Sequence, residues 1–191
     1  KYEHTKPYED GFWEKNRIDL KYGYVTQIDF NSRELHFETG DVIEYDQLIL
    51  ATGSKSNQFG WPGQNLSGVQ SLYSLQDLHL MEENSKDVDH AIIVGGGLIG
   101  VEMSEMLHSR GIKTTFLIRE TGFWQNVLPQ EEADLIGRHL EEHNVKLLLE
   151  TNLKEIKPDR NGRVKSVITD KNEEIECQMV GITVGVSPNI D

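Results

Sequence analysis

Cysteine and basic residues are scarce in this sequence, and long apolar runs are absent. The single cysteine, Cys177, excludes an internal disulfide, a C-x-x-C pair and a cysteine-cluster metal site. Only 19 Lys and Arg oppose 32 Asp and Glu, and the net charge of −13 argues against a nucleic acid or an anionic membrane surface as partner. No run approaches the roughly 20 apolar residues of a membrane span. The first residues also lack the apolar stretch of a signal peptide, so we predict an acidic, soluble, cytoplasmic protein.

The cysteine and the histidines offer little chemistry of their own. Cys177 stands in the sequence IECQM, which provides no basic partner to stabilise a thiolate, so we expect it to be inert. His139 and His143 have the i, i+4 spacing of metal ligands on a helix. Glu141 and Glu142 between them favour a solvated helix surface instead. We therefore predict no metal site.

The first quarter of the chain is predicted to be rich in β-structure. Turn-forming pairs, Asn31-Ser32 and Gly40-Asp41, separate four short runs at residues 17–21, 24–30, 34–38 and 42–52. The last run becomes fully apolar before Ala51, which is typical of a buried central strand. Residues 54–70 contain several glycines and are predicted to be a loop, and residues 74–84 a helix.

The middle of the chain alternates between strand and helix patterns. Strands are predicted at residues 91–94, 114–118 and 145–150, and helices at 98–109 and 129–143. This alternation predicts a parallel sheet with right-handed crossovers. Residues 154–184 return to short strands, with a hairpin signal at Asn161-Gly162. The polar sequence SKDVD, at residues 85–89, favours a domain boundary.

The strand over residues 91–94 leads directly into a G-x-G-x-x-G motif formed by Gly95, Gly97 and Gly100. After a strand and before a helix, this motif is typical of dinucleotide binding. Gly95 would permit the tight turn, Gly97 the approach of a pyrophosphate, and Gly100 close packing of the helix on the strand. Ile99 counts with them as a cofactor-binding residue. The alternative is a plain strand–turn–helix of an α/β core.

The end of the following strand usually selects between NAD and NADP. Ile118 stands where NAD-preferring proteins place an acidic residue, and Arg119 and then Glu120 follow. The missing carboxylate and the adjacent guanidinium favour the 2′-phosphate of NADP. Glu120 keeps NAD open as the alternative, because it could reach the ribose, and Arg119 could be a plain surface charge.

Two further motifs flank the glycine loop and carry a resemblance. The sequence YDQLILATG, ending at Gly53, resembles the ATG motif of flavoproteins that bind two dinucleotides. The run ITVGVSPN, with Gly185, Pro188 and Asn189, is similar to their later G-x-x-P-N signature. In this order the three motifs resemble the pyridine nucleotide-disulfide oxidoreductase superfamily, in which an NAD(P) domain is inserted within an FAD domain. The branch of ferredoxin reductases, NADH oxidases and nitrite reductases is the most similar.

The resemblance implies an α/β fold with a Rossmann-like three-layer NAD(P)-binding domain and part of an FAD-binding domain with a small β-rich segment. Its expected bounds are 1–88 for the partial FAD domain, 89–184 for the NAD(P) domain and 185–191 for the return. Matching positions imply roles for five residues. Thr52 and Gly53 would line the FAD side, Gly185 would face NAD(P), Leu98 would cover the flavin edge, and Glu102, the catalytic residue, would approach the nicotinamide carboxamide.

The resemblance also implies what the chain does not contain. The family opens with its own FAD-binding G-x-G-x-x-G, and no such motif precedes Ala51; it also carries a Gly-Asp motif beyond the P-N signature, where this sequence stops at Asp191. We therefore expect part of an FAD-dependent NAD(P)H oxidoreductase about twice this size, with FAD and NAD(P) as cofactors. Its partners would be an unidentified electron acceptor, either a redox protein or a small molecule, and a second copy in a homodimer. The competing interpretation is a dinucleotide-sensing binding module without hydride transfer.

Overall fold

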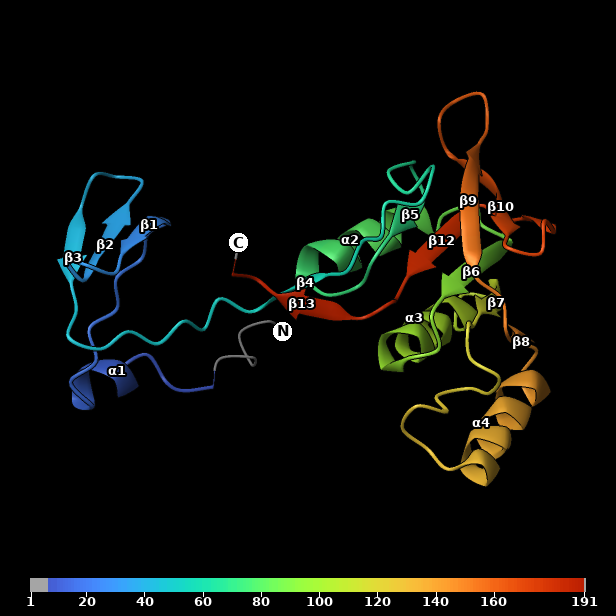
Figure 1. Ribbon diagram of the computed structural model, residues 1–191, viewed down its shortest axis with the longest axis horizontal. Helices are drawn as coiled ribbons and strands as arrows, with labels where there is room; N and C mark the ends of the chain where they lie inside the picture. Colours follow the sequence, from blue (N-terminus) through green and yellow to red (C-terminus); the bar gives the residue numbers. More distant parts are fainter. Residues whose placement is uncertain (1–6, 191) are drawn as a thin grey trace. The chain divides into compact units, whose positions relative to one another are not determined.

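The computed structural model describes residues 7–190, and the chain divides into two compact units, Lys1–Ala51 and Thr52–Asp191. The first unit holds a short helix and a three-stranded antiparallel sheet (Figure 1). Its elements are α1 (Phe12–Lys15), β1 (Val25–Asp29), β2 (Glu34–Phe37) and β3 (Val42–Glu44). Both expected turns are present: the Asp29 carboxylate accepts hydrogen bonds from the backbone N–H groups of Asn31 and Ser32, and Gly40 has a φ of +87°.

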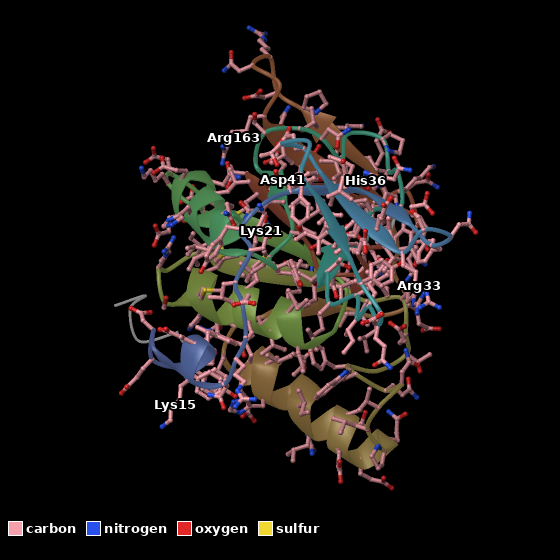
Figure 2. All side chains as sticks on the ribbon, turned by 90° about the vertical axis from the view of Figure 1, so that its left-hand side faces the viewer. Lys15, Lys21, Arg33, His36, Asp41 and Arg163 are labelled. Carbon is pink, nitrogen blue, oxygen red and sulfur yellow. The ribbon has the colours of Figure 1, made fainter. Side chains whose placement is uncertain are left out.

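The predicted strand over residues 17–21 is wrong. The chain there leaves α1, which an aromatic cluster stabilises. The rings of Tyr8 and Phe12 stack with their centroids 3.9 Å apart, and Trp13 packs edge-on against both. The Lys21 ammonium pairs with the Asp41 carboxylate in the second turn, at 2.6 Å (Figure 2).

The predicted strand over residues 42–52 is confirmed only as far as Glu44, where β3 ends. Two apolar side chains at the end of this run lie in solvent, since Ile49 is 89% exposed and Leu50 is 49% exposed. No strand among residues 7–190 pairs with residues 45–51. An apolar run becomes a buried strand only where neighbouring strands satisfy its backbone groups and a second layer covers its side chains.

The second unit is built on a five-stranded parallel sheet with the strand order β5-β12-β6-β7-β8 (Figure 1). Its strands are β5 (Val69–Gln70), β6 (His90–Val94), β7 (Lys113–Leu117), β8 (Lys146–Leu148) and β12 (Met179–Ile182). The helices are α2 (Leu75–Asn84), α3 (Leu98–His108) and α4 (Gln130–Glu142). The chain runs outward from β6 to β7 and β8, then returns to β12 on the other side of β6. The predicted alternation is confirmed, with Pro129 capping α4 rather than lying inside it.

Two antiparallel elements complete this unit. The strands β9 (Leu153–Pro158), β10 (Val164–Thr169) and β11 (Glu174–Glu176) form a three-stranded sheet in the order β11-β10-β9. The turn between β9 and β10 contains the expected Gly162, with a φ of +78°. The strands β4 (Ser54–Ser56) and β13 (Val186–Pro188) pair as a two-stranded ribbon.

The parallel sheet is buried on both faces. Ala91 and Ile93 of β6 belong to a core shared with the helices, whereas Ile92 and Val94 belong to a core shared with β9 and β10. Successive side chains of a strand point to opposite faces, so the apolar sequence of β6 reflects two cores rather than one. Helices cover one face and the antiparallel sheet covers the other, which confirms the predicted α/β class.

The segment between the two predicted domains lies inside the second unit. Met81 of α2 and Val88, which precedes β6, are buried in the same core as Ala91. The expected domain bounds, 1–88, 89–184 and 185–191, assign each segment to the FAD domain or to the NAD(P) domain. These assignments concern cofactor binding and stay a prediction. Within the part of the chain that the structure describes, no helix combines the length and the apolarity that crossing a membrane requires.

Candidate dinucleotide-binding site

The glycine-rich turn joins β6 to α3, and its three motif glycines lack a side chain for different reasons. Gly95 has a φ of +103°, and a Cβ there would lie 2.7 Å from the carbonyl oxygen of Thr183. A Cβ on Gly100 would lie 2.8 Å from the Gly95 oxygen and 3.0 Å from the Phe116 ring. A Cβ on Gly97 would meet nothing within 4 Å. The fold itself therefore requires Gly95 and Gly100, whereas the backbone at Gly97 faces open space.

The N-terminus of α3 is open to a ligand. The first N–H groups of a helix have no partner inside the helix, and the N-cap residue of α3, Gly97, has no side chain to accept them. Helix α2 differs, because the Ser74 hydroxyl accepts from the Asp77 N–H and the Asp77 carboxylate accepts from the Ser74 N–H. The free donors and the helix dipole suit the start of α3 to a phosphate.

A cavity of about 600 Å³ lies beside this turn, at the carboxyl ends of the parallel strands. Residues 95–97, Leu117 and Gly185 contribute strand ends and turns to its wall, and residues 151–153 and Trp61 close it from the side of β9. The strand order reverses at β6, and ligands of open α/β sheets bind at such a switch point. The volume is within the usual range of small-molecule sites.

Opposite charges lie together where the chain leaves β7. The Arg119 Nε donates to the Glu120 carboxylate at 2.6 Å, and the Asn126 side-chain amide donates to the same oxygen at 3.1 Å. Partial burial disfavours ionisation of Glu120, but these hydrogen bonds outweigh it and hold the pKa of Glu120 below its usual value. The hydrogen bond to Glu120 also raises the pKa of Arg119. All three residues line the cavity, so its β7 side presents a cation and an anion together.

The two flanking motifs lie side by side in the ribbon of β4 and β13. The Thr52 hydroxyl donates to the carbonyl oxygen of Asn189 at 2.5 Å, across 137 positions of sequence. The Asn189 N–H donates to the Gly53 oxygen at 3.0 Å, and the Asn57 N–H donates to the Gly185 oxygen at 3.0 Å. The last two residues of the ATG motif are thus hydrogen-bonded to the end of the P-N signature, next to this ribbon.

The predicted site residues fall into three groups. Gly95, Gly97, Arg119 and Gly185 line the cavity, and Gly100 is buried behind it. The others lie outside its wall: Leu98 (60% exposed), Ile99 (half-buried) and Glu102 (exposed) on the first turns of α3, and Thr52 and Gly53 (both exposed) on the ribbon. Leu98 and Glu102 are four residues apart and share one helix face.

The structure adds residues to the wall that sequence reasoning missed. Thr183 and Asn126 line the cavity, and so do Trp61 and Trp124. Both tryptophans pack against the cores of the unit. Trp124 also has a φ of +55°, an uncommon conformation for a large side chain and one that concentrates at functional sites. The sequence signal for the two tryptophans is that each stands near a turn-forming glycine, in WPG (residues 61–63) and in GFW (residues 122–124).

The described residues fit one dinucleotide and not two. The bare Gly97 backbone, the open start of α3 and the adjoining cavity would fit the pyrophosphate of a dinucleotide. Among residues 7–190, no second strand, glycine turn and helix repeat this arrangement. Thr52 and Gly53 are exposed residues next to the ribbon, and two exposed residues do not make a complete FAD site.

The parallel sheet, the glycine turn at its switch point and the helix that opens there define a dinucleotide-binding α/β fold. The family model described as pyridine nucleotide-disulphide oxidoreductase matches residues 4–191. The chain belongs to this family, as its three motifs predicted.

Several curated proteins are similar to nearly the whole chain. The rubredoxin-NAD(+) reductase of Ectopseudomonas oleovorans is 26% identical over 183 residues, which are 95% of this chain and 47% of that protein. An NADH oxidase of Streptococcus pyogenes serotype M6 is 30% identical over 187 residues, covering 86% of this chain and 39% of the relative. The chain therefore spans less than half the length of these relatives.

Solved structures agree on the fold. A ferredoxin reductase from Rhodopseudomonas palustris matches with a TM-score of 0.88 at 23% identity, over 96% of this chain and 45% of that one. The water-forming NADH oxidase from Lactobacillus brevis, bound to NADH, matches with a TM-score of 0.77 at 20% identity, over 86% and 38% of the two chains. At these identities the likeness establishes the fold alone.

Proposed function

We propose that this chain is the NAD(P)H-binding part of an FAD-dependent oxidoreductase that passes a hydride from nicotinamide to flavin. One observation carries the proposal: the bare backbone at Gly97 and the uncapped start of α3 face a cavity at the switch point of the sheet. The similar curated proteins support it, because they are named rubredoxin-NAD(+) reductase and NADH oxidase.

Each part of the cofactor has matching chemistry in this proposal. The pyrophosphate would accept hydrogen bonds from the N–H groups of residues 97–99, the adenosine ribose would lie near Arg119 and Glu120, and the nicotinamide would lie toward Gly185. The nicotinamide supplies the hydride, and the protein supplies position and electrostatics. Glu102 and Leu98 would act from α3 on the nicotinamide side, as the resemblance implies.

We propose NADPH as the preferred donor and NADH as a weaker one. The Arg119 guanidinium uses its Nε toward Glu120, which leaves its two terminal amino groups for a 2′-phosphate. The carboxylate of Glu120, held by Arg119 and Asn126, is an acceptor for the ribose hydroxyls of NADH. The electron acceptor would be a redox protein or a small molecule, in line with the rubredoxin reductase and the oxidase among the relatives.

Titration of the 191-residue chain with NADPH and NADH, followed by nucleotide fluorescence, tests the proposal. We expect saturable binding of both, tighter for NADPH, and displacement of either by ADP-ribose, which carries the pyrophosphate without the nicotinamide. Binding of neither nucleotide would contradict the proposed function. A bound-flavin absorbance spectrum of the longer protein would separate the oxidoreductase from a dinucleotide-sensing module, which would show none.

A further inference from the structure

Thr183 directly follows β12, and hydrogen bonds link it to the start of the glycine turn. Its side chain is 6% exposed, and its hydroxyl lies 2.9 Å from the Val94 carbonyl oxygen and 3.1 Å from that of Gly95. Its backbone N–H also donates to the Val94 oxygen, at 2.9 Å. A threonine hydroxyl has one proton to donate, so the two carbonyls share it. At these two carbonyls the chain leaves β6 and enters the turn.

The same hydroxyl lies against the first turn of α3. A Cβ on Gly100 would lie only 2.9 Å from the Thr183 oxygen. Thr183 therefore contacts both the start of the glycine turn, at Gly95, and the helix that follows it. The turn before α3 consists of three glycines, residues 95–97, which have no side chains of their own to fix the peptide planes. Glycine also loses the most conformational freedom when it is ordered.

We propose that the Thr183 hydroxyl is a positioning group, which holds the glycine turn in the conformation that receives the pyrophosphate of NAD(P)H. This inference rests on the proposed function. A turn that is ordered before the ligand arrives loses less entropy on binding than a turn that the ligand must order. The hydroxyl is essential to this role, because a methyl group 2.9–3.1 Å from two carbonyl oxygens would be inside the usual C···O contact of about 3.3–3.6 Å.

The test compares three variants of the 191-residue chain. Thr183→Val keeps the shape of the side chain and removes the hydroxyl, and Thr183→Ser keeps the hydroxyl. Thr114→Val is the matched control, because Thr114 is also buried, at 3% exposed, and its hydroxyl bonds to Ser104 at 2.8 Å away from the cavity. Each variant is titrated with NADPH and with ADP-ribose, and its thermal unfolding is recorded.

We expect Thr183→Val to raise the Kd of both ligands at least about fivefold, because it loses one hydrogen bond and also places a methyl group too close to two carbonyl oxygens. Thr183→Ser should stay within about twofold of the parent chain. Thr114→Val should lower the Tm without changing either Kd. If Thr183→Val does not fold, Thr183→Ala introduces no close contact and should show the same weakening. In the ligand-free chain, exchange of the Gly95 amide hydrogen, which donates to the Leu117 carbonyl oxygen at 3.0 Å, should be faster in Thr183→Val; a purely stabilising role would not produce this selectively.

The outcomes separate this inference from the proposed function. If the parent chain binds neither NADPH nor ADP-ribose, the proposed function fails and the inference fails with it. If the parent chain binds both and Thr183→Val binds them equally well, the proposed function stands and the positioning role is overturned. Equal weakening by Thr114→Val and Thr183→Val would also overturn it, because the effect would then follow stability alone.

Discussion

Substituting alanine at two glycines of the turn separates binding from folding. At Gly97 the added methyl meets nothing in the protein, so Gly97→Ala should fold normally. Alanine is a poorer N-cap than glycine by about 0.5–1 kcal/mol. It also restricts the unfolded chain, which returns about 0.4–1 kcal/mol. We therefore expect the free energy of unfolding to change by less than about 0.5 kcal/mol. The methyl would, however, occupy the space proposed for the pyrophosphate, and the Kd for NADPH should rise at least about tenfold.

Gly100→Ala should behave in the opposite way. The added Cβ would lie 2.8 Å from the Gly95 oxygen, 2.9 Å from the Thr183 hydroxyl and 3.0 Å from the Phe116 ring. Three such contacts place the substitution near the upper end of overpacking costs, about 3 kcal/mol. Alanine in a helix returns about 1 kcal/mol relative to glycine. The net loss of about 2 kcal/mol corresponds to a Tm lower by about 4–8 °C in a chain of this size.

Thermal unfolding and NADPH titration of both variants test this reasoning together. The expected pattern is a normal Tm with weakened binding for Gly97→Ala and a lowered Tm for Gly100→Ala. An unchanged Kd in Gly97→Ala would mean that no phosphate approaches the turn there. A normal Tm in Gly100→Ala would refute the conclusion that close packing of α3 on the turn requires this glycine.

Three further predictions address other parts of the chain. Arg119→Ala should weaken NADPH binding at least about tenfold and NADH binding less than about twofold, because only NADPH carries a 2′-phosphate; equal losses in parallel titrations would contradict this. Gly63→Ala should lower the free energy of unfolding by about 2–4 kcal/mol, because Gly63 has a φ of +82° and its Cβ would lie 2.0 Å from the Ile156 oxygen. In urea unfolding, Gly162→Ala is the control, since it has a similar φ of +78° but open space around it, and it should lose only about 1 kcal/mol; equal losses would show that the contact is not the cause. Burial raises the pKa of Cys177 from 9.0 to about 12, so iodoacetamide at pH 8 should label it only in unfolded protein, as judged by mass spectrometry. Because the unfolded thiol loses its proton first, this group should also make the fold less stable as the pH rises from 9 toward 12; rapid labelling of the native chain would contradict both expectations.

Local patterns were enough to predict most of the second unit. The strands and helices around Gly95 lie within a few residues of their predicted ends, because apolar periodicity and glycine placement depend on neighbours in the sequence. The sequence also predicted correctly that Gly95 permits a tight turn and that Gly100 lets the helix pack closely. Both are local requirements too.

Contacts between distant positions account for what the sequence could not predict. Thr183 reaches Val94 across 89 positions, and Thr52 reaches Asn189 across 137. No spacing rule within one segment reveals such pairs. The apolar run ending at Leu50 was predicted to be a buried strand from its composition. Burial also requires neighbouring strands, and among the described residues no strand pairs with this run.

The site residues predicted to bind the nicotinamide cofactor differ in their surroundings from those predicted to lie next to the flavin. Gly97, Arg119 and Gly185 converge on a cavity that residues 52–191 form by themselves, so binding should need nothing more. Leu98 and Thr52, which the resemblance assigns to the flavin side, are exposed instead and lie outside the wall of that cavity. An apolar side chain at a helix start that remains 60% exposed gains little in the isolated chain. The 191-residue chain should therefore bind NADPH and yet leave its absorbance at 340 nm unchanged over hours with added FAD, and steady consumption of NADPH would show that the chain completes a flavin site on its own.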